Sequence, residues 1–469
     1  MIEIIKNEWK GFLRNRMFLY VGVTFTIVLL ITCWVSNKQV QLQHDLQQTA
    51  QLHIRSQWDD MGATNPHNAV HFGTYAFKPY QLMNSIDEGV NAVTGNVLRL
   101  EGHVQNEMEF SEASQSLMIS VFGKLTPALL LQYVIPLFLI FLSFSAISLE
   151  RESGRIKLLV IQGLSLPKMI FYKSISLLII GMGMLFIGLF LQMLTLDLFQ
   201  NSDTFLRLFS LFLAYLFFYY ILILLTVILS AWLKTPTAAL SSILAIWVIW
   251  VVFLPKIFGL LTEDQYPLPS RQAFKLAMKV DRENGINGHA PSSNRKNEFK
   301  QKILKEYEVD SVEELPINLD GLLMQADEEY GNKVWDKHFG SNYQILKDQK
   351  WMYQLLGIID PFIALQNLSM GFSGSDLFHH QDFLLAAENY RRDFIKSLND
   401  KHAYGGSKSG DWSWKASEEF YKSINDFNYQ IPPLLHFINY YLIDVLITFF
   451  WMCILILIVQ QLSNKIEVI

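Results

Sequence analysis

The sequence predicts a mainly α-helical, polytopic membrane protein with six transmembrane helices, an N-terminal amphipathic elbow helix and two extracytoplasmic insertions, the second mostly helical. Two observations predict this class. Of the 469 residues, 51% are hydrophobic and only 17% are charged. Six apolar segments are also each long enough to cross a bilayer, because about 20 helical residues rising roughly 1.5 Å each span a hydrocarbon core of roughly 30 Å.

The first element is an amphipathic N-terminal segment, residues 1–16. Apolar and basic residues recur there at helical spacing: Ile2, Ile5, Trp9 and Phe12, with Lys6, Lys10 and Arg14 between them. Such a helix lies in the headgroup region with its basic side chains on the cytoplasmic side. We expect an elbow helix, the alternative being a charged flank of the first span. That span, residues 17–35, is long for a signal peptide and lacks a small-residue cleavage site, so we expect it to stay uncleaved.

The first polar insertion, residues 37–125, holds few basic residues, which predicts that it lies outside the cytoplasm. Helix-forming residues at the start of this insertion predict a helical stalk that continues the first span. Residues 70–77 alternate like a strand, and residues 85–100 predict a further helix. We expect a small exported domain of mixed or mostly helical structure.

The remaining spans follow from apolar length: residues 127–148, 169–196, 205–232, 238–261 and 434–459. An outer turn, residues 197–204, and a tight cytoplasmic turn at Lys234 connect three of them. Pro255, near the outer end of the fifth span, predicts a kink. Six spans place both termini on one side of the membrane, which the basic loops predict to be cytoplasmic. We therefore expect a multi-pass protein of the bacterial inner membrane.

The second polar insertion, residues 262–433, is too long for a simple loop. Helical periodicity with charged outer faces recurs in four stretches: residues 274–280, 297–307, 322–339 and 383–398. We expect a predominantly helical domain on the same outer side as the first insertion.

Composition and motifs exclude several function classes. The net charge of −5 offers no concentrated basic face for nucleic acid. Cys33 and Cys453 are the only cysteines and both lie in apolar segments, so we expect neither a disulfide framework nor a cysteine metal site. The phosphate-binding pattern G-x-x-x-x-G-K-[ST] does not occur, so we expect no ATP hydrolysis and no cofactor on this chain itself.

Three ionisable residues stand out from their surroundings. Asp444 lies roughly ten residues into the sixth span, where a charge costs at least about 2.5 kcal/mol, so it should face protein or water. It would serve a subunit interface or substrate path, or hydrogen-bond a nearby Tyr, Ser or Thr. His379 and His380 adjoin Asp376 and suggest a metal site. Adjacent helical residues point about 100° apart, however, so we expect capping or surface roles and no metal.

The loop between the second and third spans, residues 149–168, is short and basic, and with the start of the next span it reads LERESGRIKLLVIQGLSLPKMIFYK. This pattern resembles membrane subunits of ABC exporters of the ABC-2 permease family. In that family a glutamate-rich turn, a glycine, a leucine-rich coupling helix, a proline and a lysine follow in this order. Arg155 stands where the family usually has a small hydroxyl residue.

The resemblance implies a coupling loop that docks on a separate ATP-binding subunit. Gly154 would break the chain, residues 156–161 would form the coupling helix, Pro167 would end it, and Lys173 would open the third span. The residues that the resemblance assigns to this loop are Glu150, Glu152, Gly154, Arg155, Lys157, Gln162, Gly163, Pro167 and Lys173.

The second insertion extends the resemblance. The residues that carry it are Asp360-Pro361, Leu365-Gln366, Leu368-Ser369-Met370, Gly374-Ser375-Asp376, His379-His380, Phe383 and Ala387-Glu388-Asn389-Tyr390-Arg391. They are similar to the outer domain of an ABC-2 branch with large extracytoplasmic insertions, related to the permease of the nitrous-oxide-reductase maturation exporter.

The resemblance implies a non-enzymatic permease subunit of an exporter whose substrate is left open. Its partners would be an ABC ATP-binding subunit holding ATP and Mg²⁺, a second permease copy or a paralogue, and membrane lipid. One alternative is a mechanotransmission complex that drives a periplasmic partner without transport. Others are a six-span sensor or an intramembrane enzyme. The G-x-S-G of intramembrane serine proteases does occur at residues 371–374, but it lies in a polar insertion, so we expect a glycine-rich turn there.

Overall fold

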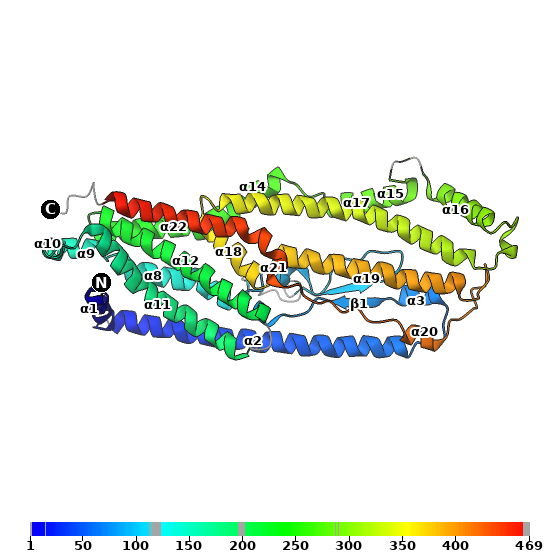
Figure 1. The fold of residues 1–469 in the computed structure, drawn as a ribbon, viewed down its shortest axis with the longest axis horizontal. Helices are drawn as coiled ribbons and strands as arrows, with labels where there is room; N and C mark the ends of the chain where they lie inside the picture. The colour runs from blue at the N-terminus through cyan, green and yellow to red at the C-terminus, as the bar shows by residue number, and fades with distance from the viewer. Residues whose placement is uncertain are drawn as a thin grey trace.

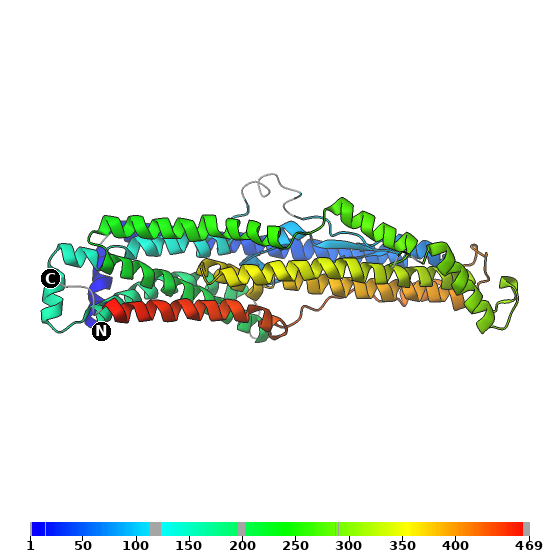
Figure 2. The ribbon, with the colours of Figure 1, turned by 90° about the horizontal axis from the view of Figure 1, so that it is seen from above.

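The computed structural model describes residues 2–14, 16–111, 114, 123–195, 202–286, 288 and 290–462. The described chain is elongated and mainly helical, with apolar helices at one end, the bundle, and polar helices at the other, the distal lobe (Figure 1, Figure 2). Helices α1 (Ile2–Arg14), α9 (Ser148–Glu152) and α10 (Arg155–Ile161) lie at the free end of the bundle. The last turn of α22 (Leu442–Leu462) lies at the same end.

Six helical segments are long and apolar enough to cross a membrane, which confirms the number of spans predicted from the sequence. They consist of α2 (Arg16–Asp59); α7 (Pro127–Leu129), η2 (Leu130–Val134) and α8 (Ile135–Ser143); α11 (Leu166–Thr195); α12 (Ser202–Trp232); α13 (Pro236–Val248), η3 (Ile249–Phe253) and α14 (Leu254–Gln265); and α21 (Leu434–Phe437), η5 (Ile438–Tyr441) and α22. The most apolar window of α12 is 72% buried, against 17% for that of α2. Since α12 also packs against α8, α11, α13 and α22, it is the centre of the bundle.

Two spans contain a wide, π-helical turn directly before a proline. Turn η2 comes before Pro136, and turn η3 comes before Pro255. Proline has no backbone N–H, and its ring collides with the carbonyl one turn earlier, so the helix distorts there. A kink was expected at Pro255, and the structure has the wide turn η3 there.

Helix α2 continues far beyond the first span, as the sequence predicted for a stalk. Its 44 residues extend roughly 66 Å at about 1.5 Å per residue, from the bundle into the distal lobe (Figure 1). At its far end, the buried Trp58 indole donates from Nε1 to the Tyr421 carbonyl (2.9 Å). Arg55 donates to the carbonyls of Lys422 (2.9 Å) and Ile424 (2.7 Å). These bonds fasten the end of α2 to helix α20 (Glu418–Lys422) and the residues after it.

The distal lobe is built from long helices and one pair of short strands. Its elements are α3 (Pro66–Phe72), β1 (Thr74–Phe77), β2 (Val97–Leu100), α15 (Arg271–Asn284), α16 (Ser292–Glu306), η4 (Val312–Glu314), α17 (Leu319–Leu356), α19 (Leu377–Tyr404) and α20. Strands β1 and β2 pair antiparallel, with Thr74 opposite Leu100. Helices α17 and α19 pack side by side along the lobe (Figure 2). The four stretches with helical periodicity in the second insertion lie in α15, α16, α17 and α19, except that Tyr307 follows the end of α16.

Two local predictions in the first insertion are wrong. Residues 85–100 were expected to form one helix, but they contain the end of η1 (Leu82–Ser85), the single turn α4 (Asn91–Thr94) and β2. Gly89 (φ +48°) and Gly95 (φ +80°) adopt left-handed conformations, which interrupt a helix. Residues 70–77 are a strand only from Thr74, because α3 runs to Phe72.

Some predicted boundaries also shift. Helix α11 begins at Leu166, so Pro167 lies in its first turn instead of ending the coupling helix. Proline is favoured there because the first N–H groups of a helix have no intrahelical acceptor. Helix α12 begins at Ser202, so the end of the outer turn predicted at residues 197–204 is helical. Residues 112–113 and 115–122 of the first insertion, residue 196 at the end of the predicted third span, 197–201 of that turn and 463–469 at the C-terminus lie outside the described residues.

Helix α18 (Pro361–Phe372) belongs to the second insertion but packs against the bundle helices α12 and α22. Gly371 allows the close approach, since an added Cβ would lie 2.4 Å from the Tyr441 ring. The G-x-S-G motif that ends α18 turns at Gly374 (φ +69°), as expected for a glycine-rich turn. Ser373 is buried beside the spans, and its hydroxyl has no hydrogen-bond partner among the described residues.

Candidate functional site

The free end of the bundle carries a short, well-defined helix between two spans. Helix α10 begins after Gly154, which adopts φ +71° at its N-cap, and ends before Gly163, which adopts φ +85°. Ile156 is buried beneath the helix, whereas Leu158 is 62% exposed and Ile161 is 82% exposed. The helix therefore presents an uncovered apolar side at the end of the molecule. A helix was predicted here at residues 156–161, and α10 begins one residue earlier.

The loop is anchored to the end of the central helix α12. Ser230 Oγ accepts hydrogen bonds from the backbone N–H of Ile147 (3.1 Å) and Ser148 (3.0 Å). The Arg151 guanidinium donates to the carbonyls of Leu233 (2.8 Å) and Ala231 (2.5 Å). Carbonyls at a helix C-terminus lack intrahelical donors, and the helix dipole favours a cation there. These bonds join α9 to the C-terminal end of α12.

A buried lysine joins the loop to α1 and α11. Lys173 Nζ, on a side chain that is 5% exposed, lies 2.5 Å from Glu8 Oε1 and 3.2 Å from Glu150 Oε1. Glu150 Oε2 also pairs with Arg155 Nε at 3.0 Å. The structure thus brings together Glu150, Arg155 and Lys173 from the predicted set. Sequence reasoning missed Glu8, which is one of two acidic residues, with Glu3, in a mainly basic amphipathic segment.

The other predicted loop residues have solvent-facing or backbone roles. Glu152, Lys157 and Gln162 are exposed. Gly154 and Gly163 supply the left-handed conformations that delimit α10, and the Gly163 N–H donates to the Val160 carbonyl (2.9 Å).

Asp444 lies at the opposite end of the bundle from the loop. It is the third residue of α22 and is fully buried within the chain. Its carboxylate accepts hydrogen bonds from Asn367 Nδ2 (2.9 Å) and Gln354 Nε2 (2.6 Å). The predicted partners were Tyr, Ser or Thr, but α17 and α18 of the second insertion supply amides instead. Lys350 also donates to Asn367, which extends this buried network to a cation.

His379 and His380 have separate partners, in agreement with their divergent directions on a helix. His379 Nδ1 lies 2.6 Å from Asp376 Oδ1, and its Nε2 lies 3.3 Å from Arg207 Nη1. Burial by itself raises the pKa of Asp376, but the hydrogen bond and charge of His379 hold it below its usual value. His380 Nδ1 faces Lys78 Nζ at 3.4 Å. Both histidines therefore connect the distal lobe to neighbouring elements.

A second buried carboxylate, which sequence reasoning missed, lies near the other face of α18 and links three parts of the chain. Asp87 accepts from Ser369 Oγ of α18 (2.5 Å), Gln132 Nε2 of the second span (3.2 Å) and the Gly89 N–H (3.0 Å). Burial raises the pKa of Asp87, and these three donors lower it in part. Tyr215 Oη of α12 lies 2.8 Å from Ser369 Oγ and continues the network into the bundle.

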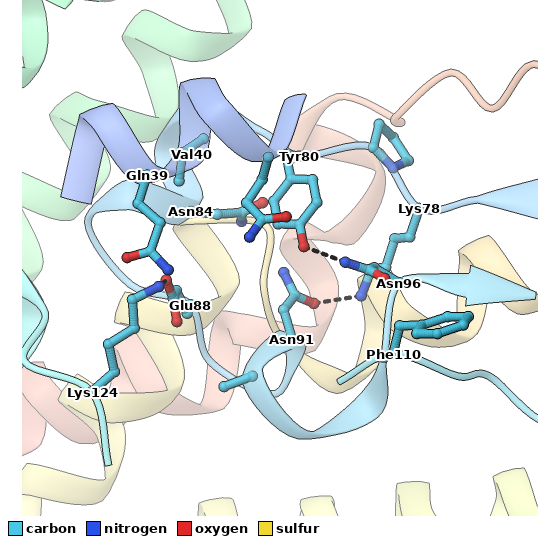
Figure 3. Close-up of a pocket in the computed structure, with 14 residues that line it drawn as sticks. Gln39, Val40, Lys78, Tyr80, Asn84, Glu88, Asn91, Asn96, Phe110 and Lys124 are labelled. Atoms are coloured by element: carbon cyan, nitrogen blue, oxygen red, sulfur yellow. Dashed lines mark hydrogen bonds and ion pairs between the residues drawn. The ribbon is translucent and has the colours of Figure 1, made fainter. Parts of the chain in front are cut away.

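Close to this network, a polar pocket opens between α2 and the segment that precedes α4 (Figure 3). Lys78 donates to Asn91 Oδ1 (2.5 Å), and Asn96 donates to the Tyr80 hydroxyl. Burial lowers the pKa of Lys78 to about 7, although Asp376 acts to raise it. At the other side of the pocket, Lys124 pairs with a glutamate on the turn before α4.

A comparison with protein-family models matches about a third of the chain. Residues 273–430 match a family model described as a domain of unknown function, DUF3526. The match begins in α15 and extends beyond α20, so it includes α18 and the Asp376–His379 pair. A comparison with curated proteins found no match.

Proposed function

We propose that this chain is the membrane-spanning subunit of an ABC-2 type exporter, in which a separate ATP-binding subunit docks on α9 and α10. The observation that carries the proposal is the uncovered apolar side of α10 at the free end of the bundle. Leu158 and Ile161 are 62% and 82% exposed there, on a helix too short to insert into a membrane by itself. In the proposed orientation this end faces the cytoplasm.

The loop is connected so that a push on α10 reaches three bundle elements. Arg151 and Ser230 join it to α12, and Lys173 joins it to α1 and α11. Closure of two ATPases upon ATP binding would displace α10 and move these helices together against a second permease copy or a paralogue. A short helix anchored at both ends transmits such a displacement better than a flexible loop.

The experiment is purification of the epitope-tagged chain from its native host in mild detergent, with co-purifying proteins identified by mass spectrometry. We expect a stoichiometric subunit that carries a phosphate-binding loop. Ile161→Asp should remove that subunit, because a charge would replace an apolar contact. Leu52→Asp is the matched control, since Leu52 is 73% exposed on the distal half of α2. Absence of an ATP-binding subunit from the wild-type preparation, or its full retention by Ile161→Asp, would refute the proposal.

A second candidate, mechanotransmission to a periplasmic partner, is favoured by the unbroken helices that link the bundle to the distal lobe. Helix α2 extends over 44 residues, and α17 over 38. Distances between spin labels on the bundle and on the lobe, measured with ATP and with ADP and vanadate, separate the two functions. Mechanotransmission requires the lobe to move relative to the bundle, whereas a lobe that stays fixed would exclude it.

A further inference from the structure

Three histidines from two separate parts of the first insertion gather at the surface of the distal lobe. His67 and His71 lie one turn apart on α3, and His103 follows strand β2. One nitrogen from each ring lies within 4.8 Å of the others, and the Nε2 atoms of His67 and His71 are 3.2 Å apart. The coupling loop and the junction around Asp444 and Asp87 involve none of these residues.

Helix α3 holds its two imidazoles on one face. Residues at positions i and i+4 of a helix project in nearly the same direction. Asn65 caps the helix by accepting from the His67 N–H (2.9 Å) and donates to the carbonyls of Trp412 (3.2 Å) and Trp414 (3.1 Å). The Trp412 ring packs against the His67 ring, with centroids 5.4 Å apart. The His67 imidazole is thus held in place by neighbouring structure, and the exposed His71 imidazole lies beside it.

The third imidazole is held in a strained backbone conformation. His103 adopts φ +66°, which is uncommon for a residue with a side chain and is found mostly where surrounding contacts enforce it. The preceding Gly102 passes so close to α3 that an added Cβ would lie 2.1 Å from a methyl group of Val70. The close passage positions His103 beside His71, with ring centroids 5.3 Å apart.

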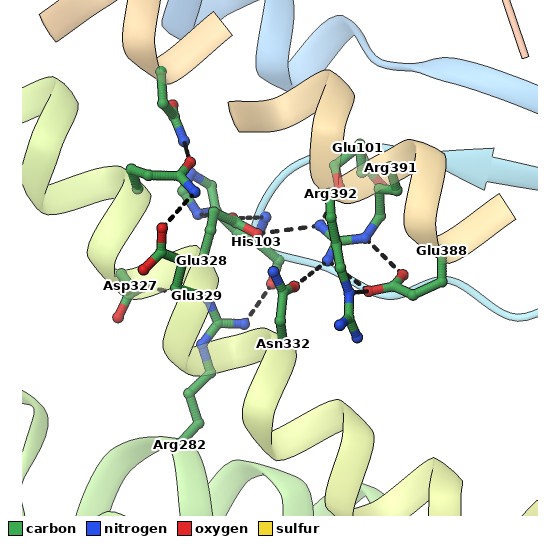
Figure 4. Close-up of polar contacts among 12 residues, drawn as sticks. Glu101, His103, Arg282, Asp327, Glu328, Glu329, Asn332, Glu388, Arg391 and Arg392 are labelled. Atoms are coloured by element: carbon green, nitrogen blue, oxygen red, sulfur yellow. Dashed lines mark hydrogen bonds and ion pairs between the residues drawn. The ribbon is translucent and has the colours of Figure 1, made fainter. Parts of the chain in front are cut away.

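A buried carboxylate orients the His103 ring. Glu328 accepts from the His103 backbone N–H and lies 2.9 Å from His103 Nδ1. Glu328 is itself held by Arg391 at 3.1 Å, while Arg282 donates to the His103 carbonyl (2.8 Å) (Figure 4). A carboxylate on Nδ1 fixes the tautomer that leaves Nε2 as the ligand atom, which is the usual arrangement behind metal-binding histidines.

We propose that His67, His71 and His103 together bind one divalent transition-metal ion of the zinc class, with a fourth position open to solvent. A Zn–N bond of about 2.1 Å implies ligand nitrogens about 3.4 Å apart in tetrahedral geometry, close to the 3.2 Å between His67 and His71. The three ligand atoms lie within 4.8 Å of one another, so binding of one ion would require one imidazole, such as that of the exposed His71, to rotate toward the others. His71 is exposed, so an ion and a water molecule have access to the site. Binding at this site does not depend on the exporter function.

The test is Zn²⁺ binding by the full chain, purified in detergent with a tag free of histidine and stripped with a chelator. Competition with a chromophoric chelator should show about one tightly bound Zn²⁺ per chain. His71→Ala and His103→Ala should each weaken binding by at least about tenfold, since each removes one of three ligands. His53→Ala, which removes an exposed histidine from α2, should bind like the wild type. Bound Co²⁺ should give the visible absorption of a four-coordinate site, which His71→Ala should abolish.

The outcomes that overturn the site are equally specific. They are the absence of stoichiometric Zn²⁺ from the wild type, or equal affinity in His71→Ala and His53→Ala. If His103→Ala fails to fold because of its contact with Glu328, the exposed His71 still decides the question. A further readout is thermal unfolding, in which Zn²⁺ should raise the midpoint of the wild type and of His53→Ala but not of His71→Ala.

Discussion

Replacing Arg391 with methionine should destabilise the distal lobe far more than the same change at its neighbour Arg392. Arg391 is 2% exposed and lies between α17 and α19 (Figure 4). Its guanidinium contacts both oxygens of Glu388 (2.8 and 2.9 Å), Glu328 (3.1 Å) and Asn332 (2.6 Å). Methionine fills similar space but provides no donor, so Arg391→Met leaves two carboxylates in the interior without their shared cation.

The expected magnitude follows from the burial of the two acids. Removal of one partner from a buried ion pair costs about 3–5 kcal/mol, because the remaining charge is uncompensated. The side chains of Glu328 and Glu388 are only 4% and 7% exposed. His103 and Arg392 still contact these acids, which favours the lower end, about 3 kcal/mol. For a unit of 150–250 residues, this is a fall of roughly 6–12 °C in unfolding midpoint.

Arg392→Met is the matched control. Arg392 is 24% exposed, and its partner Asp336 is 56% exposed. Its other partner, the buried Glu388, keeps Arg391 as a cation in this variant, so the loss should stay at about 1 kcal/mol. Thermal unfolding of both variants in the same detergent is the assay. Adding Glu328→Gln and Glu388→Gln to Arg391→Met should restore at least half of the lost midpoint, since neutral amides need no cation. Equal shifts for the two arginine variants, or no recovery in the triple variant, would refute the uncompensated-charge explanation.

Three further predictions concern the bundle and its junction with the lobe. Burial raises the pKa of Asp360 to about 8, so the folded chain keeps a proton that the unfolded chain loses above about pH 4. Stability should therefore fall as pH rises from about 4 to 8, by at most about 1.4 kcal/mol per pH unit. Asp360→Asn should make the unfolding midpoint less dependent on pH over that range, and the same pH dependence as in the wild type would contradict this. Lys173→Met should lower stability by about 2–3 kcal/mol and expose α1 to proteolysis, because it leaves Glu8 facing Glu150 without a cation between them. Lys173→Arg keeps the cation, so α1 should stay resistant to proteolysis. Gly371→Ala should cost about 1–3 kcal/mol in thermal unfolding by forcing α18 away from Tyr441, and a wild-type midpoint would show that no close contact exists.

The long helices could be predicted from the sequence because their signals are local. Apolar length identified the six spans, and amphipathic periodicity identified parts of α15, α16, α17 and α19. Strand β1 was predicted with too early a start and β2 was missed, because each has four residues, too few for an alternating pattern to stand out. Gly89 and Gly95 lie in the region that was predicted as a helix, residues 85–100. Treating both glycines as helix breakers would have corrected that prediction.

The polar contacts could not be predicted because their partners are distant in sequence. Lys173 meets Glu8 across 165 residues, and Asp444 meets Asn367 across 77. Sequence reasoning identified Asp444 by its place in an apolar span and Lys173 by the resemblance of its loop, but it had no means of choosing their partners. The His67 and His71 spacing is visible in the sequence, whereas their approach to His103 depends on the antiparallel pairing of β1 with β2.

Helix α12 connects the two polar regions of the bundle. At one end Ser230 holds the backbone before α9. At the other end Arg207, which is 2% exposed, contacts Asp203 (2.6 Å), His379 (3.3 Å) and the Pro432 carbonyl (3.0 Å). Helix α12 is also the most buried span, so it has little freedom to bend against its neighbours. A displacement of α9 and α10 must therefore shift α12 along its length or break these buried bonds. Because His379 belongs to α19, the shift would reach the distal lobe through a rigid helix and one buried ion-pair network.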